Sequence, residues 1–569
     1  DDGDNNIHMN DAETVIAQVQ SLYPNFRYKK IYWDHYPIVS TSTGNTYPAI
    51  QEEINKTMLD GALIMNYTGH GSATQLSHEQ VLKTEIFQKW SYPNLPLWLT
   101  AACDVTPLDM NKESLGTEAV FNKRGAAMGF IGTARTVYSA QNRTLNRNFM
   151  TYVLGKDDSG RRYTIGEALT LAKGAIATTR NVSNRDALNK THYVLIGDPA
   201  ITLAAPTYNI KIDQINGADV DADNPPLLSA GDVVTVSGHI EDESGNTVND
   251  YDGTVEPVVY DNLETITCNR NVLSNADTAF VYKDRTRTLF LGSEQVKGGQ
   301  FNFSFPMPLD INYSNENGLI NLYANNGQNE AHGNCTDFLV GGTGNYVQDG
   351  NGPAITAYLN SEDFQNGGEV NETPYLFITL HDNDGINTTG NGLGHDIELI
   401  IDNDEQKTYT LNNYFKPTTG GYADGTIGYS IPELSEGQHT MLIRAFDVLN
   451  NMGSLTLNCN VVKGLKPSIA NLYIKGPVRD KATIRVYNNR KGSVLNVNLW
   501  IYDMHGKLHY TQSHSGEENI DDYYEFEWNI TNSVGLIPPG IYIARVGIST
   551  VDGDEEKTEK KILVLSGNQ

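Results

Sequence analysis

The sequence has few cysteines, few basic residues and no long apolar run, and each scarcity excludes a class of protein. Its 569 residues include four cysteines and no Cys-x-x-Cys pair, which argues against a structural zinc site. No apolar stretch approaches the roughly 20 residues that span a bilayer, so any membrane association is expected to be indirect. The 41 basic residues face 69 acidic ones, for a net charge of −28. Because binding to phosphates needs clustered Lys and Arg, this balance argues against a nucleic-acid-binding protein.

The beginning of the chain also lacks features of a translation start. Its first residue is not methionine, no secretory signal sequence follows, and the chain opens on Asp1, Asp2, Gly3 and Asp4. This pattern indicates a processed or truncated start.

The first part of the chain alternates apolar runs with amphipathic segments. Short continuous apolar runs at residues 62–67, 95–102 and 126–131 predict buried strands. Helical patterns over residues 48–59, 113–122 and 164–178 lie between or after them. This alternation predicts an α/β layer with a parallel sheet.

The character of the sequence changes near residue 206, where helical periodicity gives way to short alternating strands with Gly, Asn and Asp turns. This spacing is typical of immunoglobulin-like β-sandwich modules. Turn-rich stretches predict domains at residues 1–206, 207–343, 344–465 and 466–569. The expected fold class is therefore a multidomain chain, with an α/β domain followed by three all-β modules.

Two residues with catalytic chemistry follow the most apolar strands. His70 lies between Gly69 and Gly71 just after the first strand, and Cys103 follows two alanines after the second. Catalytic residues commonly lie at the carboxyl ends of parallel strands, and an imidazole can activate a thiol. A cysteine after an apolar strand is more often inert core, however, and a histidine between glycines is often only a turn residue. The residues alone leave both interpretations open.

Three segments resemble the gingipain family of caspase-like cysteine peptidases. They are NYTGHGS at residues 66–72, LPLWLTAAC at 95–103 and YVLIGDPAITL at 193–203, in the order that the family shows. The resemblance covers about 200 residues and implies a caspase-like catalytic domain. It also implies strands before Asp1, so the domain is expected to be incomplete at its N-terminus and to need a preceding portion of the same protein.

The resemblance implies roles for individual residues of the site. Cys103 would be the nucleophile, His70 the general acid and base, and the amides of Gly71 and Cys103 the oxyanion hole. Asp1 or Asp2 would orient the histidine, although both are equally consistent with solvated terminal acids or cation ligands. No cofactor is required for such catalysis.

The segment at residues 132–143 follows the third strand and is a candidate wall of the substrate site, with Thr133, Tyr138 and Ser139 facing the substrate. An ordinary surface loop is the alternative. No acidic residue must lie in a specificity pocket, so a preference for basic substrates does not follow.

The last domain resembles the C-terminal secretion domain of type IX cargo proteins, through KGPVRD at residues 475–480, PPGIYIARV at 538–546 and KKILVL at 560–565. A gingipain-like domain joined to this module is similar to the C-terminal signal peptidases, or sortases, of that secretion system. The resemblance implies an enzyme on the outer face of the Gram-negative outer membrane. It would remove cargo C-terminal domains through a thioester and link the cargo to anionic lipopolysaccharide. The implied partner is the outer-membrane β-barrel PorV.

Other interpretations stay open beside this one. A general secreted gingipain-like protease and a non-catalytic surface adhesin or scaffold are the two alternatives. Asp382, Asp384 and Asn387 are spaced like ligands of a structural Ca²⁺, although an Asx-rich turn explains them equally well. Cys268 and Cys335 fall in one predicted module and could form a disulfide.

Overall fold

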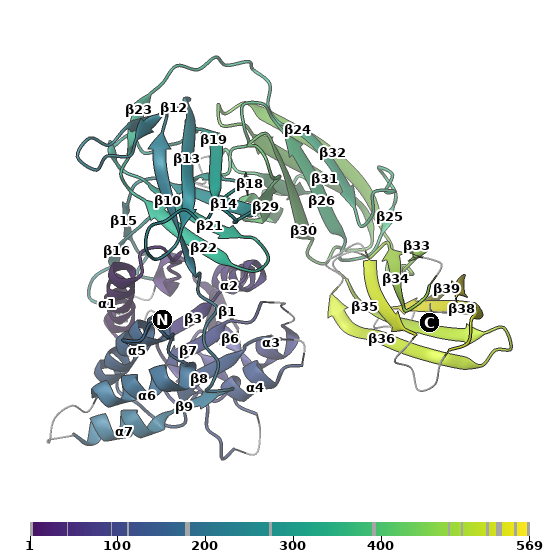
Figure 1. The fold of residues 1–569 in the computed structure, drawn as a ribbon, viewed down its shortest axis with the longest axis horizontal. Coiled ribbons are helices and arrows are strands. Elements are labelled where there is room, and N and C mark those ends of the chain that lie inside the picture. The colour runs from purple at the N-terminus through teal and green to yellow at the C-terminus, as the bar shows by residue number, and fades with distance from the viewer. Residues whose placement is uncertain are drawn as a thin grey trace.

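The structure is a computed structural model of the chain. It describes all residues except 1–3, 43, 91, 93, 111–112, 124, 177–182, 272–275, 390–393, 476–477, 491–492, 519–522, 531–536, 551–554 and 566–569. The α/β domain lies at one end of the molecule, and three β-rich regions follow it in chain order (Figure 1). No helix in the described part of the chain is both long enough and apolar enough to span a membrane.

The α/β domain contains one central sheet surrounded by helices. Its helices are α1 (Ile7–Leu22), η1 (Trp33–His35), α2 (Pro48–Asp60), α3 (Thr84–Lys89), α4 (Leu115–Phe121), α5 (Ser139–Val153), α6 (Ile165–Ile176) and α7 (Asn184–His192). Its strands are β1 (Val39–Thr41), β2 (Gly44–Thr46), β3 (Ile64–Thr68), β4 (Gly71–Ser72), β5 (Gln75–Leu76), β6 (Leu82–Lys83), β7 (Leu97–Ala101), β8 (Gly129–Thr133) and β9 (Tyr193–Ile196). The three strands and three helices expected from the sequence are all present, with shifted ends. Helices α1, α3, α5 and α7 were not predicted.

The central sheet has the order β3-β7-β8-β9. Strands β3, β7 and β8, the three expected from the sequence, are parallel as predicted, whereas β9, a strand that was not predicted, pairs with β8 antiparallel. The Ala134 amide just past the end of β8 donates to the His192 carbonyl just before β9. The chain therefore enters β9 at the carboxyl end of β8, which makes the pair antiparallel.

Strand β7 is buried on both faces, which explains why all its residues except Thr100 are apolar. Trp98 packs in a cluster with residues of α2, α3 and α4, while Leu97 and Leu99 pack in a second cluster with residues of α1, α5 and α6. Side chains alternate between the faces of a strand, so a strand covered by helices on both sides needs apolar residues throughout.

The second region contains β10 (Tyr208–Ile215), β11 (Ala218–Asp219), β12 (Leu227–Ala230), β13 (Val233–Glu241), β14 (Gly253–Tyr260), β15 (Glu264–Thr267), β16 (Val281–Asp284), β17 (Thr288–Leu291), β18 (Glu294–Val296), β19 (Gln300–Pro306), β20 (Glu316–Asn317), β21 (Leu319–Asn325), β22 (Glu330–Cys335) and β23 (Leu339–Thr343). A nine-stranded sheet and the β12-β23-β20 sheet share one apolar core. The β15–β16 pair is a separate hairpin, and it packs against α1 of the α/β domain through a small apolar cluster.

The third region contains β24 (Ala354–Leu359), β25 (Glu369–Val370), β26 (Tyr375–His381), β27 (Glu398–Ile401), η2 (Glu405–Lys407), β28 (Thr408–Thr410), η3 (Asn412–Tyr414), β29 (Phe415–Pro417), β30 (Asp424–Ser430), β31 (Gly437–Phe446) and β32 (Met452–Val461). The fourth contains β33 (Ile469–Ile474), β34 (Lys481–Asn488), β35 (Val494–Asp503), β36 (Leu508–Glu518), β37 (Tyr523–Asn529), β38 (Gly540–Ser549) and β39 (Glu555–Val564). Each region has two sheets around one core. This arrangement agrees with the β-sandwich expectation.

The four cysteines are all free. Cys268 belongs to the small cluster between the β15–β16 hairpin and α1, whereas Cys335 belongs to the core of the second region. The disulfide considered for this pair therefore does not form, because the two side chains are buried in different clusters.

Candidate active site

The parallel register of β3 and β7 places His70 and Cys103 at adjacent strand ends. Thr68 pairs with Ala101 in this register, and each catalytic candidate lies two residues beyond its paired position. The Gly69 amide donates to the Ala101 carbonyl at 3.3 Å, which extends the contact beyond the last paired residues. The two segments thus leave the sheet side by side, as the sequence led us to expect.

Gly71 lies so close to the Cys103 segment that only glycine fits there. A Cβ atom at Gly71 would lie 2.6 Å from Val105 Cγ1 and 3.1 Å from the Cys103 carbonyl oxygen. Real Cβ atoms do not approach other atoms as closely as the first of these distances. Glycine therefore lets the backbone beside the histidine approach the backbone of the nucleophile.

The Cys103 thiol is half-buried and lies against Val137. Its Sγ atom is 3.5 Å from the Val137 amide nitrogen and 3.6 Å from the Val137 carbonyl oxygen. Burial raises the pKa of the Cys103 thiol, the Asp104 charge acts in the same direction, and the hydrogen bond from Val137 opposes them. A thiol of this kind stays protonated near neutral pH, so it needs a base to become a nucleophile.

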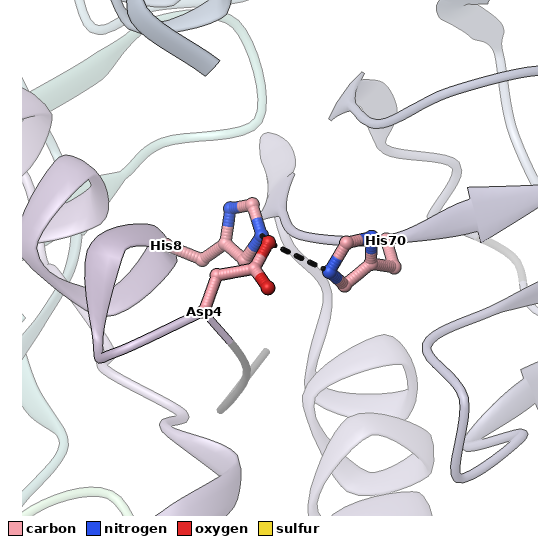
Figure 2. A group of neighbouring side chains, drawn as sticks. All are labelled: Asp4, His8 and His70. Carbon is pink, nitrogen blue, oxygen red and sulfur yellow. Dashed lines mark ion pairs between the residues drawn. The ribbon is translucent and has the colours of Figure 1, made fainter. Parts of the chain in front are cut away.

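His70 is positioned by Asp4. Its Nε2 atom lies 3.1 Å from Asp4 Oδ2, and Figure 2 shows the two groups pointing toward each other. The Tyr67 hydroxyl and the Ser77 amide donate to the His70 carbonyl, at 2.7 and 2.9 Å, which fixes the backbone of the segment. A carboxylate in this place orients the imidazole and stabilises its protonated form.

Among the residues that the structure describes, the carboxylate beside His70 is that of Asp4. The sequence had pointed to Asp1 or Asp2, which lie outside the described residues. The signal for Asp4 was present in the same acidic opening of the chain. Asp4 was not chosen because the turn geometry determines which of these neighbouring carboxylates faces His70, and that geometry cannot be predicted from the sequence.

The second region holds the segment that carries Asp4. Asp4, Asn5 and Asn6 have φ angles of 57°, 55° and 64°, three successive residues in the left-handed region. Asn5 exchanges two hydrogen bonds with Asp277, at 3.2 and 3.0 Å, and the Asn6 side chain donates to the Thr278 carbonyl at 2.9 Å. Non-glycine residues rarely adopt this conformation, so contacts from outside the segment must stabilise it.

Two further histidines flank His70. The ring of His8 makes an edge-to-face contact with His70 at 4.9 Å, and the ring of His78 contacts it at 4.7 Å. Burial, with the nearby charge of His70 acting in the same direction, lowers the pKa of His8 to about 4. His8 is therefore neutral at physiological pH. Sequence reasoning missed both residues.

The segment predicted to form the substrate wall lies beside Cys103, but its three candidate residues differ in exposure. Thr133 is fully buried at the end of β8, and its hydroxyl donates to the Ala102 carbonyl at 2.5 Å. It supports the nucleophile segment from beneath, and the prediction that it faces substrate is wrong. Tyr138 and Ser139 are partly exposed at the start of α5, so they remain candidates for substrate contact.

The predicted calcium ligands separate into two groups. Asp384 lies with Asp349 and Asp447, and one carboxylate oxygen of each is within 4.8 Å of the others. Burial and then the charges of Asp447, Asp384 and Asp349 raise the pKa of Asp382 to about 6, although its backbone hydrogen bond from Asp384 opposes them.

Asn387 is engaged elsewhere, because its amide donates to Asp310 and to Asn450. Calcium binding at the acidic group stays a prediction.

Comparison with known proteins agrees with the cysteine peptidase chemistry of the site. Residues 1–204, which form the α/β domain, match the model of peptidase family C25, the gingipain family of cysteine peptidases. A comparison with curated protein sequences gives no match.

Among solved structures, the chain is similar to dimeric latent PorU from Porphyromonas gingivalis, with 31% identity over 78% of this chain and a TM-score of 0.33. It spans 41% of that PorU chain. It is also similar to the Arg-specific cysteine proteinase gingipain R, with 16% identity over 60% of this chain and 65% of that one and a TM-score of 0.30. A complex of the pro- and mature domains of Porphyromonas gingivalis RgpB shows 15% identity over 56% of this chain and 63% of that one, with a TM-score of 0.27.

Proposed function

We propose that the protein is a cell-surface cysteine endopeptidase and transpeptidase that removes C-terminal secretion domains from type IX cargo proteins. The observation that carries the peptidase chemistry is the placement of Cys103 and His70 at adjacent strand ends, with Asp4 behind the histidine. The choice of cargo is supported by the C-terminal module, whose segments resemble those of the cargo domains themselves.

The first half of the reaction forms a thioester. His70 takes the proton from the Cys103 thiol, and the thiolate attacks the scissile carbonyl carbon to give a tetrahedral oxyanion. Backbone amides of Gly71 and Cys103 are the proposed donors to that oxyanion. When the C–N bond breaks, the departing amine takes the proton back from His70. The cargo then remains attached to Cys103 through a C–S bond.

The second half transfers the cargo to an amine. An amine of anionic lipopolysaccharide attacks the thioester carbonyl and gives its proton to His70. The C–S bond breaks, an amide bond forms and the thiolate regains a proton from His70. Hydrolysis differs only in that water replaces the amine, so the product depends on which nucleophile reaches the thioester first. The β-barrel protein PorV is the proposed partner that holds the enzyme at the outer membrane.

Replacing Cys103 with Ala in cells and analysing secreted cargo by mass spectrometry tests this proposal. We expect the cargo to keep its C-terminal domain and to lack the lipopolysaccharide modification. Cargo that is still cleaved and modified in the C103A cells would contradict the proposal. If wild-type cells cleave the cargo but never attach the glycolipid to it, the enzyme is a peptidase without transpeptidase activity.

A further inference from the structure

His8 is an anomaly that the peptidase mechanism does not use. Its side chain is 9% exposed, and within the described part of the chain neither ring nitrogen makes a hydrogen bond, although Asp4 Oδ2 lies 3.5 Å from Nε2 as an ion-pair partner. Buried polar groups in native proteins are almost always hydrogen-bonded, so an unsatisfied imidazole calls for an explanation. Figure 2 shows its ring turned toward Asp4 and His70.

The three side chains bring their ligand atoms to the spacing of a zinc site. Asp4 Oδ2 lies 3.5 Å from His8 Nε2 and 3.1 Å from His70 Nε2. One ligand atom of each residue lies within 4.8 Å of the other two. Ligands bound tetrahedrally to zinc at about 2.0–2.1 Å are themselves roughly 3.4 Å apart. Small side-chain movements would therefore complete three corners of the tetrahedron.

We propose that Asp4, His8 and His70 form an inhibitory binding site for Zn²⁺. Two imidazoles and one carboxylate suit zinc far better than calcium or magnesium, which prefer oxygen ligands. The fourth position would be open to water, as in sites with three protein ligands. The site differs from the acidic group near Asp384, which offers only carboxylates.

Zinc bound here would stop the peptidase reaction, a consequence that rests on the proposed role of His70. The imidazole must become a cation when it takes the thiol proton. With zinc on Nε2, a proton taken up by the other ring nitrogen would place a second positive charge beside the metal, which is strongly disfavoured. Asp4 would also bind the metal and so would no longer stabilise a protonated His70. Free zinc would thus hold the enzyme in a reversible inactive state.

The binding test uses the full chain with Cys103 replaced by Ala, so that the thiol cannot bind the metal. Zn²⁺ is titrated by calorimetry, and the zinc X-ray absorption spectrum is recorded at one equivalent. We expect one zinc per chain with two imidazole ligands. His8→Gln should weaken this binding at least about tenfold, the usual effect of removing a ligand or its support. Asp4→Asn provides a second variant at an exposed position, which does not disturb the core.

His78→Gln is the matched control, because His78 also contacts the His70 ring and is not part of the three-residue cluster. It should bind zinc like the parent protein. Equal binding by the His8→Gln and parent chains, or a spectrum without imidazole ligands, would overturn the proposal. Because this test uses an inactive chain, its result does not depend on whether the peptidase assignment is correct.

A second experiment tests whether zinc bound at this site inhibits the peptidase activity. Zinc should inhibit the active chain, a chelator should restore it, and His8→Gln should need at least about tenfold more zinc for half inhibition of its own activity. Zinc that binds at the cluster without changing turnover would refute the inhibitory role.

Discussion

The carboxylate of Asp4 lies 3.1 Å from the Nε2 atom of His70, although the two residues come from opposite sides of the site. Asp4 precedes α1, whereas His70 follows β3. The short segment before α1 therefore adds a carboxylate to the proposed catalytic pair at the strand ends.

Replacing Asp4 with Asn should lower kcat with little change in KM. The amide keeps the size of the side chain but cannot stabilise a protonated His70, and positioned acid–base partners contribute roughly 10²–10⁴-fold to rate. Steady-state kinetics on a peptide substrate measures the loss. Asp4→Glu restores the charge and should recover part of the rate. If Asn and Asp support equal turnover, Asp4 does not assist His70.

Asn5, next to Asp4, is hydrogen-bonded to Asp277 in the segment between β15 and β16. This contact predicts that the second region supports catalysis by holding Asp4 in place. Asp277→Ala removes the carboxylate that accepts from the Asn5 side chain and keeps the backbone amide that donates to Asn5, so the left-handed segment that carries Asp4 should lose part of its order. A hydrogen bond contributes about 0.5–1.5 kcal/mol, so we expect kcat to fall about two- to tenfold with KM unchanged. Asn5→Ala removes both hydrogen bonds and should lower kcat at least as far, and the double variant should be no worse than Asn5→Ala alone. Additive losses would show that the two side chains act separately.

The strands could be predicted from the sequence more accurately than the residues of the site around them. Strand β7 is apolar except at Thr100 because helices cover both faces, and this makes it and the Cys103 that follows easy to locate. Asp4 could not be chosen over Asp1 or Asp2, because its position depends on left-handed backbone angles and on a hairpin remote in sequence. Thr133 was misplaced because only the structure shows that its hydroxyl turns inward to Ala102.

The raised pKa of Cys103 predicts how the thiol reacts with pH. The thiolate is the reactive form, and burial disfavours it, so alkylation by iodoacetamide should keep accelerating through about pH 8.5, the ordinary thiol range. The rate is measured by the mass of the modified peptide at several pH values. The buried Cys459 is an internal control that should react much more slowly, since burial leaves its side chain inaccessible. A plateau below neutral pH would instead indicate a thiolate–imidazolium pair at rest.

The third region should become less stable as the pH rises, because Asp382 loses its proton there beside other carboxylates. The pKa of Asp382 is about 6 in the folded protein because burial and neighbouring carboxylates disfavour its charge. In the unfolded chain this pKa is about 3.9. A raised folded pKa means that the full stabilising contribution is present below about pH 4 and is lost as the pH rises through 6.

Asp382→Asn should therefore raise the free energy of unfolding of this region at pH 7 in the presence of a chelator, by at most about 3 kcal/mol. The gain over wild type should vanish near pH 4, and urea unfolding at several pH values measures it. Calcium tests the metal prediction in the same assay. If the carboxylates of Asp349, Asp384 and Asp447 bind it, calcium should stabilise wild type at pH 7, because the ion offsets the repulsion. Unfolding curves that are identical with calcium and with chelator would contradict a calcium site there.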